Sequence, residues 1–381
     1  MSLEGIKMLD FSQSPLLVIW EVTQACDLAC VHCRASAMPG RHEDELTTEE
    51  GYRLLDQVKA FGEARGFGSP LFVFTGGDPL KRPDLYDLIR HSVKLGLRTN
   101  VTPSSTPLLT TEAIDRFKEA GVARMAISVD GADAATHDAF RQVPGSFDRC
   151  MMALRHAQKI GLETQFQTTV TKRNMHQLDR VADIVGEVGS KMWSLFFLIV
   201  TGRALAGDDL AAEEYEQVFA KMYEISKRVP FDIKTTEAMH YRRYIIEREK
   251  AERKARGEQE TAPAENEKAK GMAFRTAGVS DGRGFVFVSH RGEVFPSGFL
   301  AVSAGNVRRD SLVDVYRNSQ LFNVLRDPKQ REGKCGACEY VHVCGGSRSR
   351  AFALTGDYLA EDPRCVYMPK HYEPELAGVG A

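Results

Sequence analysis

Strand-like and helix-like segments alternate strictly from Leu16 to about Val200, and this alternation limits the fold of the 381-residue chain more than any other feature. The strand-like segments are short and rich in β-branched and aromatic residues: Leu16–Glu21, Pro70–Phe74, Leu97–Val101, Arg124–Val129, Thr164–Val170 and Trp193–Ile199. The helix-like segments are amphipathic and lie between them: Thr47–Phe61, Asp84–Leu95, Thr111–Ala120, Phe147–Ile160 and Met175–Val188. Such alternation implies right-handed crossovers and a parallel sheet in an α/β protein. Six units in about 190 residues predict a partial (βα)6 TIM-like barrel, because the eight-unit barrel needs ~250 residues.

Cysteines form two separate groups at opposite ends of the chain. Cys26, Cys30 and Cys33 follow the first predicted strand with the spacing C-x3-C-x2-C, which supplies three thiols and no fourth. A structural zinc site uses four ligands, and iron–sulfur clusters are usually held by four cysteines. Three thiolates on a four-iron cluster would leave one iron open to a small molecule. The alternative is a loop of buried or zinc-binding cysteines.

Two glycines follow the second predicted strand, in the segment Thr75-Gly-Gly-Asp-Pro79. Functional residues of barrels lie on the loops at the carboxyl ends of strands, where both this segment and the first cysteine group fall. Glycines at such a place allow the backbone to approach a ligand closely.

In these two motifs the chain resembles the radical S-adenosylmethionine (SAM) enzymes. The resemblance implies a (βα)6 barrel in which Cys26, Cys30 and Cys33 hold a [4Fe–4S] cluster. It further implies that the amino and carboxylate groups of SAM chelate the open iron, and that an electron from the cluster cleaves SAM to a 5'-deoxyadenosyl radical.

The same resemblance identifies candidate SAM contacts. Gly76, Gly77 and Asp78 stand where the family usually has Gly-Gly-Glu, whose backbone and acid contact the SAM amino group; Asp78 is shorter than that glutamate. The remaining candidates follow the fourth strand or lie on the fifth: Ser128, Asp130, Arg141, and either Gln167 or Thr169.

Asp130 and Arg141 each have an alternative role that involves no ligand. The resemblance places Ser128 and Asp130 beside the SAM carboxylate and ribose, but Asp130 could equally cap the turn before Gly131. Arg141 is either a partner of the SAM carboxylate or a surface arginine.

The second cysteine group has the spacing C-x2-C-x5-C-x20-C and consists of Cys335, Cys338, Cys344 and Cys365. Four thiols can close a site for zinc or for a four-iron cluster, and spacing alone favours zinc. The tail, with Pro296–Leu300 and Gly345–Arg350, resembles the SPASM or twitch module, which implies one auxiliary cluster, expected to be [4Fe–4S]. Ser297 stands where many relatives have cysteine, so its role is open and a second auxiliary cluster is not expected.

The patterns predict three parts of the chain. Residues 1–240 form the radical SAM barrel core, 241–275 a charged helix and flexible linker, and 276–381 a small α+β iron–sulfur domain. Within the last part, Gly284–Pro296 has the pattern of a β-hairpin around an Arg-Gly turn.

Composition excludes several classes of partner. The formal net charge is −2 and the pI about 6.6, which favour neither a nucleic-acid nor a membrane partner. The first residues lack the order of a signal peptide, and clustered cysteines in a reducing compartment more often bind metal than form disulfides. We therefore expect a cytoplasmic protein.

Five segments resemble the tetrapyrrole-modifying branch, which acts in heme biosynthesis and includes the alternative heme b synthase and the nitrite-reductase heme maturase: Trp20–Cys26, Cys33–Ala37, Asp138–Gly145, Thr201–Arg203 and Gly356–Glu361. This resemblance implies decarboxylation of tetrapyrrole propionates, with a ferredoxin or flavodoxin as electron donor. Arg203 follows the sixth predicted strand and is a candidate partner of a substrate carboxylate, since arginine forms bidentate contacts with such groups. Maturation of a ribosomally made peptide or protein cofactor is the alternative. A non-catalytic metal-binding scaffold, which would not cleave SAM, is the third.

Overall fold

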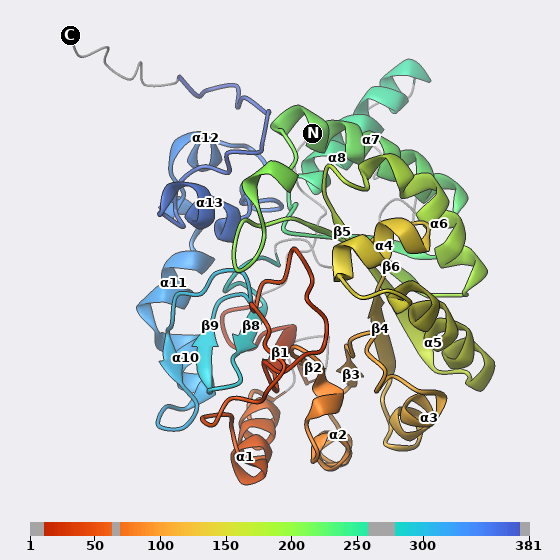
Figure 1. Cartoon of the computed structure of the whole chain (residues 1–381). Helices are drawn as coiled ribbons and strands as arrows, with labels where there is room; N and C mark the ends of the chain where they lie inside the picture. The colour runs from red at the N-terminus through yellow and green to blue at the C-terminus, as the bar shows by residue number, and fades with distance from the viewer. Residues whose placement is uncertain (1–10, 63–68, 258–278, 374–381) are drawn as a thin grey trace.

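The computed structural model describes residues 11–62, 69–257 and 279–373 (Figure 1). Its strands form one sheet in the order β10-β9-β8-β1-β2-β3-β4-β5-β6-β7. Their bounds are β1 Leu17–Glu21, β2 Leu71–Thr75, β3 Thr99–Val101, β4 Arg124–Ser128, β5 Glu163–Val170, β6 Met192–Phe197, β7 Asp232–Thr236, β8 Phe285–Val288, β9 Glu293–Phe295 and β10 Gly305–Asn306. Strands β1 to β7 pair in parallel, and β8 pairs in parallel with β1. The pairs β8–β9 and β9–β10 are antiparallel.

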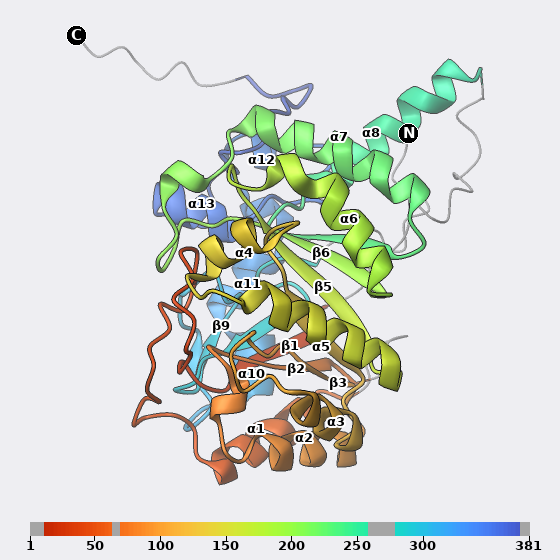
Figure 2. The ribbon, with the colours of Figure 1, turned by 45° about the vertical axis from the view of Figure 1, so that its right-hand side comes forward.

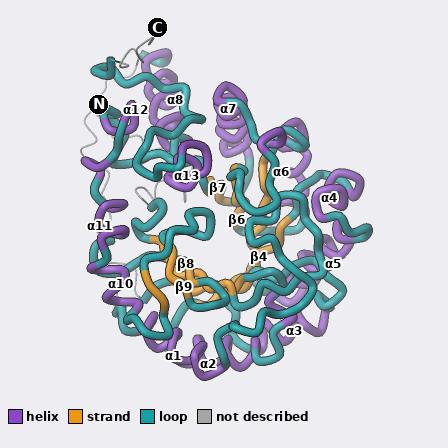
Figure 3. Tube along the Cα trace, turned by 60° about the vertical axis from the view of Figure 1, so that its left-hand side comes forward, coloured by secondary structure: helices purple, strands orange, loops and turns teal. Residues whose placement is uncertain are grey.

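The helices lie mainly outside this curved sheet (Figures 2 and 3). They are α1 Thr48–Lys59, α2 Leu85–Lys94, α3 Thr111–Glu119, α4 Ala134–Arg141, α5 Ser146–Ile160, α6 Leu178–Glu187, α7 Ala212–Arg228, α8 Tyr241–Ala255, α10 Leu312–Asn318, α11 Gln320–Arg326, α12 Gly333–Gly336 and α13 Arg348–Thr355. Four short 3-10 turns complete the list: η1 Pro79–Lys81, η2 Met175–Gln177, η3 Ala206–Asp208 and η4 Pro328–Gln330. None of the helices in the described ranges is long and apolar enough to cross a membrane.

Alternation along β1 separates the hydrophobic core from the interior of the barrel. Val18 and Trp20 are fully buried in the core between sheet and helices, whereas Leu17 and Ile19 line an interior cavity. Gly51 of α1 allows this packing, because a Cβ there would lie 2.8 Å from the Trp20 ring.

All six predicted strands are present, and the partial parallel barrel is confirmed. The sheet is longer than predicted because β7 joins β6 and β8 joins β1. β7 was not predicted, since its sequence Asp-Ile-Lys-Thr-Thr has a single apolar residue. The chain forms two separate helices, α10 and α11, because Ser319 caps the second one.

The C-terminal hairpin was predicted correctly but is not separate from the barrel sheet. β8 and β9 pair through Phe287 with Phe295, and Gly292 takes the positive φ of 86° that the turn requires. Because β8 also pairs with β1, the sheet crosses the predicted boundaries at residues 240 and 275, which remain a prediction. Helix α8 occupies the first part of the segment 241–275, and residues 258–275 lie outside the described residues.

Candidate active site

Loops after successive strands line a cavity of about 210 Å³ at the carboxyl end of the barrel. Nine of the predicted site residues line it: Cys26, Cys30, Cys33, Gly76, Gly77, Ser128, Arg141, Gln167 and Thr169. The other two predicted SAM contacts, Asp78 and Asp130, are fully buried behind this lining, and Arg203 contacts the cysteine loop from outside the cavity.

The first cysteine group forms a folded loop closed by its own backbone. The amide of Cys26 donates to the carbonyl of Met38 at 2.7 Å. Backbone N–H groups point at two of the sulfurs, from Leu28 to Cys26 and from Ala37 to Cys33, both at 3.4 Å. Burial raises the pKa of the Cys26 thiol to about 11, so this side chain becomes a thiolate at neutral pH only when a cation displaces the proton.

The two glycines after β2 bring their loop against the cysteine loop. A Cβ on Gly76 would lie 2.5 Å from the carbonyl oxygen of Thr23, and one on Gly77 would lie 2.4 Å from that of Ala25. The amide of Gly77 donates to the carbonyl of Thr23 at 2.8 Å. Glycine is therefore required here by the approach of two backbones, in addition to any contact with a ligand.

Asp78 joins the β2 loop to the β3 loop. Its carboxylate accepts from the backbone amides of Leu80 at 3.1 Å and Ser104 at 3.4 Å, and from the hydroxyl of Thr106 at 2.5 Å. Burial raises the pKa of Asp78, although these donors oppose the effect. The side chain is used within the protein, so its predicted contact with SAM remains a prediction.

Asp130 and Arg141 form a buried pair beside the cysteines. Asp130 Oδ2 lies 2.6 Å from Arg141 Nη2, and Asp130 Oδ1 accepts from the amide of Thr169 at 2.8 Å. Burial raises the pKa of Asp130, but Arg141 and His32 outweigh it and hold the pKa below its usual value. Asp130 is thus more than a turn cap, and Arg141, whose side chain is 12% exposed, is not a surface arginine.

Arg141 continues from this pair towards the first cysteine group. Its Nη1 donates to Cys30 Sγ at 3.6 Å, while its Nε is buried without a hydrogen-bond partner among the described residues. Nδ1 of His32 is likewise buried without a partner in the part of the chain that the structure describes. Burial lowers the pKa of His32 to about 4, so its imidazole is neutral. These groups leave donor capacity beside the cavity for an anionic ligand.

Arg203 supports the cysteine loop. Its Nε donates to the carbonyl of Cys30 at 2.9 Å and its Nη1 to that of Ala37 at 3.1 Å. Neighbouring Gly202 is packed so closely that a Cβ would lie 2.3 Å from the Cys33 carbonyl oxygen. These contacts show a positioning role, and the substrate contact expected of Arg203 remains a prediction.

The second cysteine group is assembled by the tail. Cys335, Cys338, Cys344 and Cys365 all line one small cavity. Three of the sulfurs accept backbone N–H groups: Cys335 from Asp362 at 3.3 Å, Cys338 from Tyr340 at 3.4 Å and Cys344 from Gly346 at 3.4 Å. Burial raises the pKa of Cys338 to about 11 and of Cys365 to about 12. Four thiols around one cavity, three of them with an N–H donor aimed at sulfur, suit a thiolate-bound metal centre, and such donors are found around iron–sulfur clusters.

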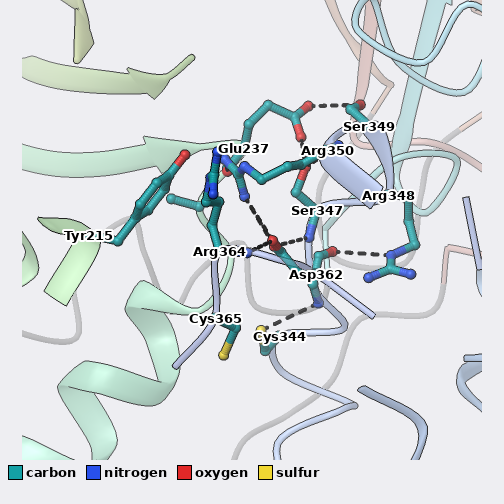
Figure 4. Close-up of polar contacts among 12 residues, drawn as sticks. Tyr215, Glu237, Cys344, Ser347, Arg348, Ser349, Arg350, Asp362, Arg364 and Cys365 are labelled. Atoms are coloured by element: carbon teal, nitrogen blue, oxygen red, sulfur yellow. Dashed lines mark hydrogen bonds and ion pairs between the residues drawn. The ribbon is translucent and has the colours of Figure 1, made fainter. Parts of the chain in front are cut away.

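A buried polar network beside this site was not predicted from the sequence (Figure 4). Arg350 Nη1 lies 3.0 Å from Asp362 Oδ2, with both side chains 1% exposed. Ser349 and Arg350 lie in the first turn of α13, and the hydroxyl of Ser349 donates to the carboxyl group of Glu237 at 3.3 Å. Burial together with Asp281 raises the pKa of Glu237. Ser297 donates to Glu237 at 3.4 Å, so the serine in the usual cysteine position is part of this network.

A second cavity of about 260 Å³ lies in the interior of the barrel. Both cavities share the same six lining residues: Arg34, Thr75, Thr102, Gln167, Phe196 and Phe299. Small-molecule sites are commonly concave, with mainly apolar walls and few polar groups. The space beside the cysteines thus continues into the interior of the barrel.

Comparison with known proteins agrees with this arrangement. Residues 20–185 match the model of the radical SAM superfamily. The chain is 38% identical to the AdoMet-dependent heme synthase of Methanosarcina barkeri, with 95% of this chain and 99% of that protein covered. It is 40% identical to the AdoMet-dependent heme synthase of Nitratidesulfovibrio vulgaris, with 96% of each chain covered. The crystal structure of Streptococcus suis SuiB bound to S-adenosylmethionine has a similar fold, with a TM-score of 0.69 at 15% identity over 93% of this chain and 78% of SuiB.

Proposed function

The chain belongs to the heme-synthesis branch of the radical SAM superfamily, and we propose that it decarboxylates propionate side chains of iron-coproporphyrin III to give heme. The observation that carries this proposal is the similarity to heme synthases along about 95% of the chain. The geometry supports it, because the three-thiol site opens into a cavity in the interior of the barrel.

Each group of residues has a separate task in this proposal. Cys26, Cys30 and Cys33 would hold the cluster, which would supply the electron for reductive cleavage of SAM. Conversion of a propionate to a vinyl group would give one hydrogen atom to the deoxyadenosyl group and release carbon dioxide, and a one-electron acceptor would take the remaining electron. Arg141 binds the SAM carboxylate, and Asp130 orients Arg141. The backbone of Gly76 and Gly77 and the side chains of Ser128 and Thr169 form the remaining wall of the SAM site.

We propose an auxiliary [4Fe–4S] cluster, rather than zinc, at the second cysteine group. The support is the set of four thiols around one cavity, their N–H donors, and the fold shared with SuiB. The buried network of Arg350 and Asp362 would fix the backbone that carries Cys335 and Cys365.

We further propose that the enzyme works in the cytoplasm with a ferredoxin or flavodoxin as reductant. All eight cysteines are free thiols in the structure, which suits a reducing compartment.

Anaerobic incubation of the reconstituted enzyme with SAM and dithionite tests the class of reaction. We expect 5'-deoxyadenosine, and its formation should increase when iron-coproporphyrin III is present. Absence of deoxyadenosine above background would support the metal-binding scaffold instead. Uncoupled deoxyadenosine that does not respond to the porphyrin would favour a peptide substrate.

A further inference from the structure

Lys234 lies inside the barrel, on the strand that was not predicted. In β7, Ile233 is 8% exposed and packs into the core, whereas Lys234 lines the interior cavity. Lys234 pairs in register with Ser194 of β6, two residues before Phe196. Phe196 lines both cavities, but Lys234 lines only the interior one. The lysine therefore lies farther from the cysteines than the place where the cavities meet.

The charge of Lys234 is not neutralised within the described residues. No ion pair or hydrogen bond of its ammonium group is found there, and the charges that reach it are those of Arg242 and Arg124, both positive. Burial lowers the pKa of Lys234 to about 8, and both arginines act in the same direction, yet most of the side chain remains charged at neutral pH.

The other charged groups of this cavity are already engaged. Arg34 pairs with Glu21, and Arg242 donates to the carbonyls of Val343 at 2.9 Å and Val279 at 3.2 Å. Asp281 and Glu237 both accept from the hydroxyl of Ser349, at 2.7 Å and 3.3 Å. Burial together with Asp281 raises the pKa of Glu237, which favours its neutral form. Lys234 is thus a cation that faces the interior cavity and lacks the anion that a buried charge normally requires.

We propose that Lys234 binds a propionate carboxylate of the porphyrin substrate and holds the macrocycle in the interior cavity, an inference that rests on the proposed function. Because the lysine lies away from the cysteines, it would bind a propionate that is not being oxidised. The ion pair anchors one edge of the macrocycle while another propionate is presented to the SAM site. Lys234 is therefore a positioning residue for substrate.

Porphyrin binding to the anaerobically reconstituted holoenzyme tests this role. The change of the Soret band gives the Kd for iron-coproporphyrin III with wild type, Lys234→Met and Lys234→Arg. Lys191→Met is the matched control, because Lys191 is exposed just before the neighbouring strand β6. The tetramethyl ester of the same porphyrin, which has no carboxylate, serves as the second ligand.

We expect Lys234→Met to raise the Kd of the acid form roughly tenfold or more, since a charged hydrogen bond is worth about 1.5–3 kcal/mol and 1.4 kcal/mol is tenfold. Lys234→Arg and Lys191→Met should stay close to wild type, and the ester should bind wild type and Lys234→Met equally. An unchanged Kd in Lys234→Met, or equal weakening of acid and ester, would overturn the inference. If wild type cleaves SAM but binds no porphyrin, the proposed function itself fails and the inference fails with it.

Discussion

The carboxylate of Asp130 lies 2.6 Å from the guanidinium of Arg141, and the same guanidinium donates to Cys30 Sγ at 3.6 Å. Asp130 lies two residues after the end of β4, and Arg141 is the last residue of α4. The loop and helix that follow β4 therefore bring the two side chains together. Since both side chains are buried beside the cavity, the pair fixes a positive group next to the first cysteine group. This relationship connects the barrel strands to the proposed SAM site.

The variant Asp130→Asn should weaken SAM binding. Loss of the carboxylate leaves Arg141 without its buried counter-ion, and the guanidinium is then free to turn away from the SAM carboxylate. We expect a loss of roughly tenfold to hundredfold in SAM affinity, the range found when partners that orient a ligand-binding group are removed. Isothermal titration calorimetry of the reconstituted protein measures it, with Asp115→Asn, whose side chain is 45% exposed, as control. Equal SAM affinity in wild type and Asp130→Asn would show that the pair has only a structural role.

Iron analysis should distinguish an auxiliary cluster from zinc. Wild type reconstituted anaerobically should contain about eight irons per chain, the content of two four-iron clusters. The double variant Cys335→Ala/Cys338→Ala should contain about four and still cleave SAM. Cys150→Ala is the control, because Cys150 lies in the hydrophobic core, and it should retain about eight. About four irons in both wild type and the double variant would contradict the auxiliary cluster.

The variant Asp362→Asn should be less stable than wild type. Burial raises the pKa of Asp362, but Arg350 and His240 outweigh it and hold the pKa well below its usual value. Removing one partner of a buried ion pair costs roughly 3–5 kcal/mol. Because a depressed pKa stabilises the fold at pH values above the unfolded pKa, the difference should be full at pH 7 and shrink as the pH falls below about 4. Denaturant unfolding at several pH values measures the difference in the free energy of unfolding, with Asp183→Asn, at a half-exposed position, as control. A difference that does not change with pH would show that the pair has no electrostatic role.

The variant Lys234→Met should be more stable than wild type when no substrate is bound. The pKa of about 8 lies below the usual 10.5, so the charged lysine destabilises the folded state at pH values below 8. This cost is lost as the pH rises from 8 to 10.5. At pH 7 we expect a gain of about 1–3 kcal/mol, since one pKa unit corresponds to about 1.4 kcal/mol. Thermal unfolding at pH 7 and pH 10.5 measures the gain, and a loss of stability at pH 7 would show that Lys234 has a counter-ion.

Site residues whose motif lies within a short stretch of sequence could be predicted. Residues whose role depends on contacts between distant segments could not. The cysteine loop and Gly76-Gly77 are recognised because their spacing carries the chemistry and they follow strands with clear apolar patterns. Asp362 and Arg350 are twelve positions apart and meet only in the folded tail, so neither signals the other. Lys234 was missed because β7 has no alternating apolar pattern, and its interior position depends on pairing with β6.

The mass of the porphyrin after anaerobic turnover tests the central proposal most directly. Wild-type enzyme, SAM, reductant and iron-coproporphyrin III are incubated together, and the porphyrin is extracted for mass spectrometry. Our account predicts a loss of about 46 Da for each propionate converted, as carbon dioxide and two hydrogens, up to a total of about 92 Da when two are converted. An unchanged porphyrin mass, with deoxyadenosine still produced, would contradict it.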